Sequence, residues 1–196
     1  MDFRKWPALT HKGTGEDAGL WQEDLAVGLI WEATSKGVIR HDSKAPSWSW
    51  LSVKGPIKGL DRKAPPSSMI ELIEVHSSIN ISLTVKGKVL RATLGQRSVT
   101  QESRHYILAE SNSSDIQGEA FLDTTLPDDV EMMGITCLFV LEVFDKEHFD
   151  LTLAAKETGY QRLGIGVLWE KSISYKDPEI GSEVLERVLE EIVTLI

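Results

Sequence analysis

The stretch Ala45-Pro46-Ser47-Trp48-Ser49-Trp50-Leu51-Ser52-Val53, followed by Gly55-Pro56-Ile57, is the most distinctive part of the chain. Its two tryptophans stand one residue apart, and in an extended strand this spacing places both indoles on the same face. Pro46 can open a strand because that position needs no amide donor, and Gly55-Pro56 supplies a closing turn. We therefore predict a strand with Trp48 and Trp50 side by side.

The residues upstream of this stretch predict a helix over positions 17–33. Asp17 is a typical N-cap residue, and the apolar positions cover most of the helix circumference. A helix with so wide an apolar surface is expected to lie between other elements of the core. The apolar positions are Leu20, Trp21, Leu25, Leu29 and Trp31.

Downstream of the tryptophans, strand patterns dominate. Residues 79–85 alternate apolar and polar, and Lys86-Gly87 predicts a tight turn into a second strand at 89–94. Residues 69–75 predict another strand, whose alternation slips near Ile73 as it does at a bulge. These patterns indicate a hairpin and a neighbouring strand.

The last third of the chain contains a buried strand, and its apolar residues then change from strand-like to helical spacing. The continuous apolar run at 135–143 is typical of a strand buried on both faces, and further strands are expected at 149–155 and 163–168. Asp177-Pro178 and the helical spacing that follows predict an amphipathic helix over 178–193. We expect a β-rich α+β fold: a curved antiparallel sheet, as a sandwich or partly closed barrel, with an N-terminal and a C-terminal helix packed on it.

We expect a single domain over residues 1–196. It would consist of a helix plus the tryptophan-containing strand at 17–57, a β-rich body at 68–170 and the C-terminal helix at 178–193. A chain of 196 residues is long enough to bury a normal core.

Several spaced segments together point to a family. In chain order they are Trp6-Pro7-Ala8-Leu9, Ala18-Gly19-Leu20-Trp21-Gln22-Glu23-Asp24-Leu25, Gly28-Leu29-Ile30-Trp31, the tryptophan stretch, Gly118-Glu119-Ala120-Phe121-Leu122-Asp123, Cys137-Leu138-Phe139-Val140 and Tyr160-Gln161-Arg162-Leu163-Gly164-Ile165-Gly166. This order resembles the region downstream of the HET domain in fungal heterokaryon-incompatibility proteins. The resemblance is dense over about the first 57 residues and collinear to roughly position 169.

The resemblance implies a non-catalytic accessory or interaction domain in fungal non-self recognition, with a HET-domain protein or another protein as partner. In the family the HET domain precedes this region and carries the motifs thought to trigger cell death. No position here matches those motifs, so no functional residue is carried over from the HET domain. We expect a stand-alone relative of the region, a remnant of a longer gene or a repurposed descendant.

Composition excludes several other classes of protein. The net charge of −9 argues against a nucleic-acid partner, because phosphates need a concentrated positive face. The single cysteine, Cys137, lies in an apolar run, so we expect a buried inert thiol in a reducing compartment. The sequence has neither a signal-peptide pattern nor an apolar run near the roughly 20 residues of a membrane span. We therefore expect a soluble, cytoplasmic protein without a membrane partner.

The chain has no recognisable cofactor or metal motif. Its five histidines are scattered without ligand spacing, and no glycine-rich phosphate loop is followed by the required lysine. The serines of the tryptophan stretch do not lie at a strand-to-helix turn. We therefore predict no metal, no cofactor and no catalytic residue.

The tryptophans allow two interpretations. Trp21, Trp31, Trp48 and Trp50 fall within 30 residues and would form an aromatic core, each ring burying roughly 150–250 Å². Alternatively they line a pocket for an apolar small molecule, with Asp24 or a serine hydroxyl as its polar anchor. The chain would then be a stand-alone small-molecule-binding protein or a cofactor-independent cyclase or isomerase that uses one carboxylate. A third possibility is a dimerisation module that uses the C-terminal helix.

Overall fold

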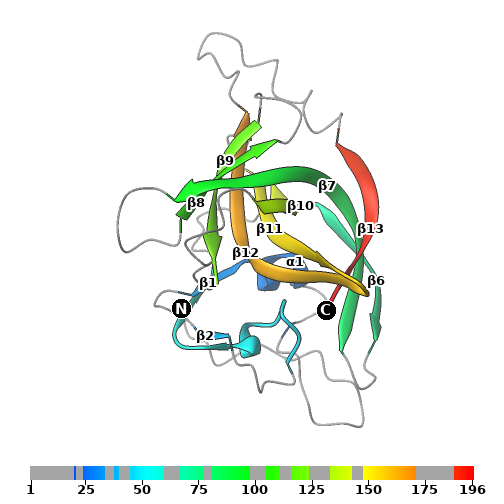
Figure 1. Cartoon of the computed structure of the whole chain (residues 1–196). Helices are drawn as coiled ribbons and strands as arrows, with labels where there is room; N and C mark the ends of the chain where they lie inside the picture. Colours follow the sequence, from blue (N-terminus) through cyan, green and yellow to red (C-terminus); the bar gives the residue numbers. More distant parts are fainter. Residues whose placement is uncertain are drawn as a thin grey trace.

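The computed structural model describes residue 20 and residues 24–33, 38–39, 45–59, 67–76, 81–97, 105–110, 116–123, 133–142, 148–170 and 188–196. Strands dominate these residues, together with one short α-helix and one 3-10 turn (Figure 1). The elements are α1 (Leu25–Leu29), β1 (Trp31–Ala33), β2 (Val38–Ile39), the 3-10 turn η2 (Trp50–Ser52), β3 (Val53–Lys54), β4 (Ile57–Gly59), β5 (Ser67–Ser68), β6 (Ile70–His76), β7 (Ser82–Arg97), β8 (His105–Glu110), β9 (Ile116–Leu122), β10 (Met133–Glu142), β11 (His148–Lys156), β12 (Gly159–Glu170) and β13 (Leu189–Leu195).

Six strands close into a ring in the order β7, β8, β9, β12, β11, β10 and back to β7, with every neighbouring pair antiparallel. β7 is long enough to belong to two layers. Its second half completes the ring, and its first half pairs with β6 and β13. Figure 1 shows β7 in green arching over the molecule and descending beside the red β13. A three-stranded layer, β6–β7–β13, therefore lies beside the closed ring.

The sheet β10–β11–β12 is shared by two apolar cores. Inside the ring, Cys137 and Phe139 of β10 pack with residues of β7, β9 and β12. On the opposite face, Leu138 and Val140 pack with α1 and with the inner side of the β6–β7–β13 layer. Every residue of β10 from Ile135 to Leu141 is therefore buried, and the predicted strand buried on both faces is confirmed.

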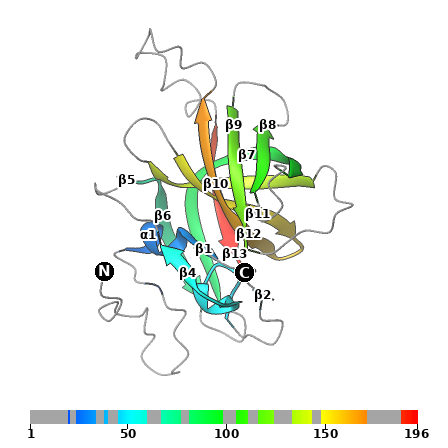
Figure 2. The ribbon, with the colours of Figure 1, turned by 90° about the vertical axis from the view of Figure 1, so that its left-hand side faces the viewer.

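The first elements of the chain lie at one end of the molecule. α1 packs against the second core through Leu25, Ala26 and Leu29. β1 pairs with β4, which lies beside it in Figure 2. β2 pairs with β3 as a second small sheet. Among the described residues, no helix combines the length and the apolar character needed to cross a membrane.

The β-rich character and the curved sheet are confirmed, whereas the C-terminal helix is wrong in its described part. Leu189–Leu195 forms β13, antiparallel to β7, and residues 178–187 lie outside the described residues. This segment forms a strand because Val193 and Leu195 alternate into the core, while Ile192 remains 66% exposed. A β-branched run at Ile192-Val193-Thr194 also favours an extended backbone.

The predicted N-terminal helix is correct at Leu25–Leu29 and wrong beyond it. Trp31–Ala33 is a strand, because its edge pairs with β4 and because the carbonyls of Leu29 and Trp31 accept hydrogen bonds from Arg162. The Arg162 guanidinium thus supplies the donors that amides four residues further on would supply in a continuing helix. Positions 17–19 and 21–23 lie outside the described residues.

The tryptophan stretch is not an extended strand. It forms a turn and then η2, where Ser49 accepts a hydrogen bond from the amide of Leu51 at 3.1 Å and so caps the turn. Trp48 is completely buried and Trp50 is 38% exposed, so the two indoles do not share a face. The alternation of serine and tryptophan predicted an extended strand, but serine side chains that hydrogen-bond the local backbone favour a turn here.

The predicted hairpin at 79–94 is also wrong. Lys86-Gly87 lies in the middle of the continuous strand β7, and Gly87 permits close packing there. A Cβ at Gly87 would lie 3.0 Å from side-chain atoms of both Ile70 and Leu138. The slip near Ile73 is confirmed, since the register of β6 against β7 shifts between Leu72 and Glu74.

Candidate functional site

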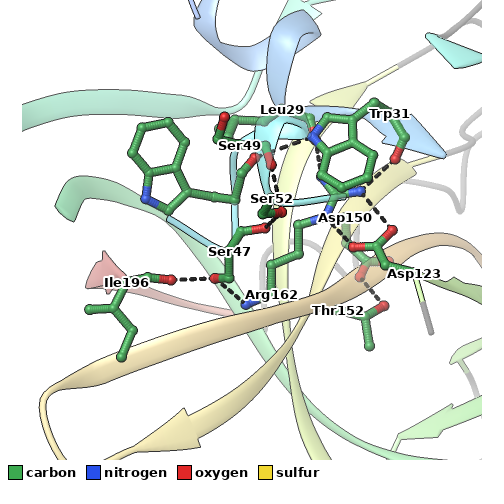
Figure 3. A network of polar contacts seen from close by, with 11 residues as sticks. Leu29, Trp31, Ser47, Ser49, Ser52, Asp123, Asp150, Thr152, Arg162 and Ile196 are labelled. Carbon is green, nitrogen blue, oxygen red and sulfur yellow. Dashed lines mark hydrogen bonds and ion pairs between the residues drawn. The ribbon is translucent and has the colours of Figure 1, made fainter. Parts of the chain in front are cut away.

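The first polar cluster is a buried network centred on Arg162 of β12. The guanidinium has no solvent exposure and forms an ion pair with Asp123, Nε donating to Oδ2 at 2.9 Å and Nη2 to Oδ1 at 3.3 Å. Nη1 donates to the carbonyl of Leu29 at 2.6 Å, and Nη2 also donates to the carbonyl of Trp31. The guanidinium carbon lies 3.6 Å from the centre of the Trp31 ring (Figure 3). Ion pairing, hydrogen bonding and stacking therefore hold one cation.

Backbone contacts extend this Arg162 network to the tryptophan stretch. The amide of Arg162 donates to Ser47 Oγ at 3.0 Å, and the Ser47 hydroxyl donates to the carbonyl of Ile196. Trp31 Nε1 donates to the carbonyl of Trp48 at 3.2 Å. Figure 3 shows Trp31, Ser47, Arg162 and Ile196, which are far apart in the sequence, meeting in this network. The network therefore ties the N-terminal elements to β12 and to the end of β13.

The Arg162 network is suited to structure rather than to chemistry. Its cation is neutralised by a carboxylate and shielded by an indole, so it has little capacity left for a ligand. Removing one partner of such a buried pair typically costs about 3–5 kcal/mol, because the other charge stays buried.

The second polar cluster lies inside the ring, on β11. His148, Asp150 and Thr152 occupy alternate positions of this strand and point into the ring, while Leu151 and Leu153 face the second core. Cys137 of β10 is the register partner of Thr152. Asp150 and Thr152 are completely buried, and His148 is 5% exposed. We call His148, Asp150 and Thr152 the interior polar row.

Two atoms of the interior polar row have no hydrogen-bond partner among the described residues: Asp150 Oδ2 and His148 Nδ1. The other carboxyl oxygen, Oδ1, accepts a long hydrogen bond of 3.4 Å from the Thr152 hydroxyl. The imidazole of His148 meets the ring of Phe139 edge-on, with centroids 5.8 Å apart. A buried polar atom without a partner typically costs about 1–3 kcal/mol, so the row is energetically strained.

Burial determines the ionisation of these groups. It raises the pKa of Asp150 to about 7, and hydrogen bonding by Cys137 and Thr152 only partly opposes this rise. Burial, reinforced by the nearby Asp150, raises the pKa of the Cys137 thiol well above its ordinary value. Burial lowers the pKa of His148, assisted by Lys88 and opposed by Glu142. All three groups therefore favour their neutral forms.

Four of the five residues predicted for a tryptophan-lined pocket lie in the described part of the chain. Trp31 and Trp48 are buried in contact with each other, Trp50 is partly exposed, and Trp21 lies outside the described residues. Asp24 is exposed just before α1 and makes no side-chain cap hydrogen bond.

Sequence reasoning did not single out Arg162, Asp123 or Asp150. Arg162 and Asp123 lie in segments that carry the family resemblance, and that is the one signal that pointed to them. Asp150 has no such signal, because alternation of polar and apolar residues on a strand ordinarily predicts polar side chains in water.

Comparison with known proteins gives no match to a family model, to a curated protein or to a solved structure. The described residues contain no group of three or more His, Cys, Asp or Glu side chains placed to hold a metal ion.

Proposed function

We propose that the chain is a non-catalytic accessory or interaction domain related to the region downstream of the HET domain in fungal heterokaryon-incompatibility proteins, with a role in non-self recognition. One observation carries the proposal. The segments that resemble this region are far apart in sequence, yet Leu29, Trp31, Ser47, Asp123 and Arg162, which come from four of them, meet in the Arg162 network.

This convergence supports a shared architecture rather than a shared activity. Residues that are needed only to stabilise one arrangement of the fold can explain why these spaced motifs occur together without any catalytic activity. In such a domain, function would lie on the outer surface that a partner contacts. The partner we propose is a HET-domain protein supplied in trans.

A binding experiment tests this proposal. Purified full-length chain would be titrated into purified HET domains from the same organism by calorimetry, and each pair would be co-expressed in a fungal host. We expect saturable micromolar binding to at least one HET domain and a loss of viability that needs both proteins. An unrelated β-rich protein of similar charge is the matched control.

The same material tests the small-molecule alternative. A panel of apolar metabolites would be screened by intrinsic tryptophan fluorescence. No shift is expected, because Trp31 and Trp48 are already buried against protein atoms. A saturable shift, together with no binding to any HET domain, would contradict the proposed function and support a stand-alone binder or cofactor-independent enzyme.

A further inference from the structure

The interior polar row has an environment that suits one very small ligand. Its register partners on the two adjacent strands are Cys137 and Phe139 on β10 and Gly166 on β12. β7 and β9 add the apolar side chains Leu90, Ala92, Leu94, Ala120 and Leu122 to this core. Two charged side chains, Lys88 of β7 and Glu142 of β10, act on His148 at one end of the row. Among the described residues neither of them pairs with the Asp150 carboxyl, whose Oδ2 has no hydrogen-bond partner.

The space beside the carboxyl is already filled. A Cβ built on Gly166 would lie 2.8 Å from Cγ and from Oδ1 of Asp150, so the carboxyl occupies the place of a side chain at Gly166. Nearby, a Cβ on Gly118 would lie 2.7 Å from Leu168 Cδ2, and one on Gly164 would lie 2.7 Å from Leu122 Cα. A six-stranded ring is also narrower than the eight-stranded barrels whose interiors side chains just fill. Beside these described glycines, the row has room for a proton and not for an added side-chain-sized group.

We propose that the interior polar row is a proton-binding site, in which a protonated Asp150 keeps the ring tightly closed and its ionisation loosens β11 from β10 and β12. The geometry is a fully buried carboxyl, two unpartnered polar atoms and a neighbouring thiol, and among the described side chains the carboxyl has no ion-pair partner. An ionised carboxylate in this place would lack its water shell and have only Thr152 and Cys137 to replace it.

The direction of the effect follows from linkage. Burial places the pKa of Asp150 at about 7 in the folded chain, against 3.8 when the residue is exposed. Between these values the folded state holds one proton more than the unfolded state, so stability falls as the pH rises from about 4 to about 7. Above about pH 7 both states are ionised and this contribution is constant.

The test compares the full-length chain with its Asp150→Asn variant, which is nearly isosteric and stays neutral. Unfolding in urea would be followed between pH 4.5 and 8. The ratio of unfolding constants, wild type over variant, is expected to rise by up to tenfold per pH unit until about pH 7 and then level off. The exposed Glu119→Gln is the matched control and should leave the corresponding ratio constant. If the ratio of wild type to the Asp150→Asn variant stayed constant between pH 5 and 7, the proposal would be overturned.

A second measurement covers the case in which the variant does not fold. In the wild-type chain, carbon-13 NMR of the aspartate carboxyls should show one group titrating near neutrality, and hydrogen exchange should show β11 amides losing protection over the same range, after correction for intrinsic exchange. Titration of every aspartate below pH 5 would overturn the proposal, and so would a protection of β11 that does not change with pH.

Discussion

At the scale of single residues, Arg162 is the side chain that contributes most to holding the N-terminal elements in position against β12. Replacing it with lysine keeps the charge but loses the planar group that bonds Asp123 in two places and stacks on Trp31. We expect Arg162→Lys to lower the free energy of unfolding by about 2–4 kcal/mol, measured by urea denaturation.

Arg91 provides the matched control for this prediction. It forms an ion pair with Glu191 at 2.8 Å, but its side chain is 49% exposed. Exposed pairs typically contribute about 0–1 kcal/mol, so Arg91→Lys should change stability by less than about 1 kcal/mol. Equal effects of the two substitutions would contradict a special role for the buried network.

Gly166 is the residue that makes room for the buried carboxyl. A methyl group there would collide with Asp150, so Gly166→Ala should destabilise the chain by about 2 kcal/mol or more. The loss should shrink when Asp150 is also replaced by alanine, because the collision is then removed. Gly134→Ala is the control: nothing lies within 4 Å of its added Cβ, and we expect a change below about 0.5 kcal/mol. Additive losses in the double variant would argue against the contact.

At the scale of elements, β13 gives two neighbouring residues with opposite expectations. Val193 has no exposure and lies in the second core, whereas Ile192 is 66% exposed. Val193→Ala should therefore cost about 1–3 kcal/mol and Ile192→Ala less than about 0.5 kcal/mol, as measured by chemical denaturation. Similar losses at both positions would indicate that this segment does not alternate as a strand.

The same elements show what the sequence can and cannot predict. The bulge in β6 and the double burial of β10 follow from local alternation and from a continuous apolar run, so both were predictable. β13 was mistaken for a helix because its apolar residues satisfy two periods, and only pairing with β7 selects the strand. Asp150 was unpredictable for a related reason: the closure of the ring, which is a long-range property, turns the polar side of β11 inward.

At the scale of the whole molecule, the buried polar clusters have different consequences. The Arg162 network joins a cation to an anion and leaves the pair neutral. The interior polar row instead buries two ionisable groups, Asp150 and His148. The aspartic acid is neutral at low pH, whereas the imidazole is neutral at high pH. The dependence of global stability on pH should therefore come largely from one strand, β11, among the described elements.

The two groups of β11 oppose each other, and this gives a final prediction. Asp150 contributes stability that is present below about pH 4 and declines by roughly 4 kcal/mol as the pH rises to about 7. The lowered pKa of His148 acts in reverse: its contribution is present above the unfolded value of 6.5 and is lost as the pH falls below it. His148→Gln should consequently raise stability relative to wild type only below about pH 6.5, as followed by circular dichroism in urea. Because glutamine stays neutral, a constant difference between the two proteins from pH 5 to 8 would show that the imidazole is not held neutral by burial.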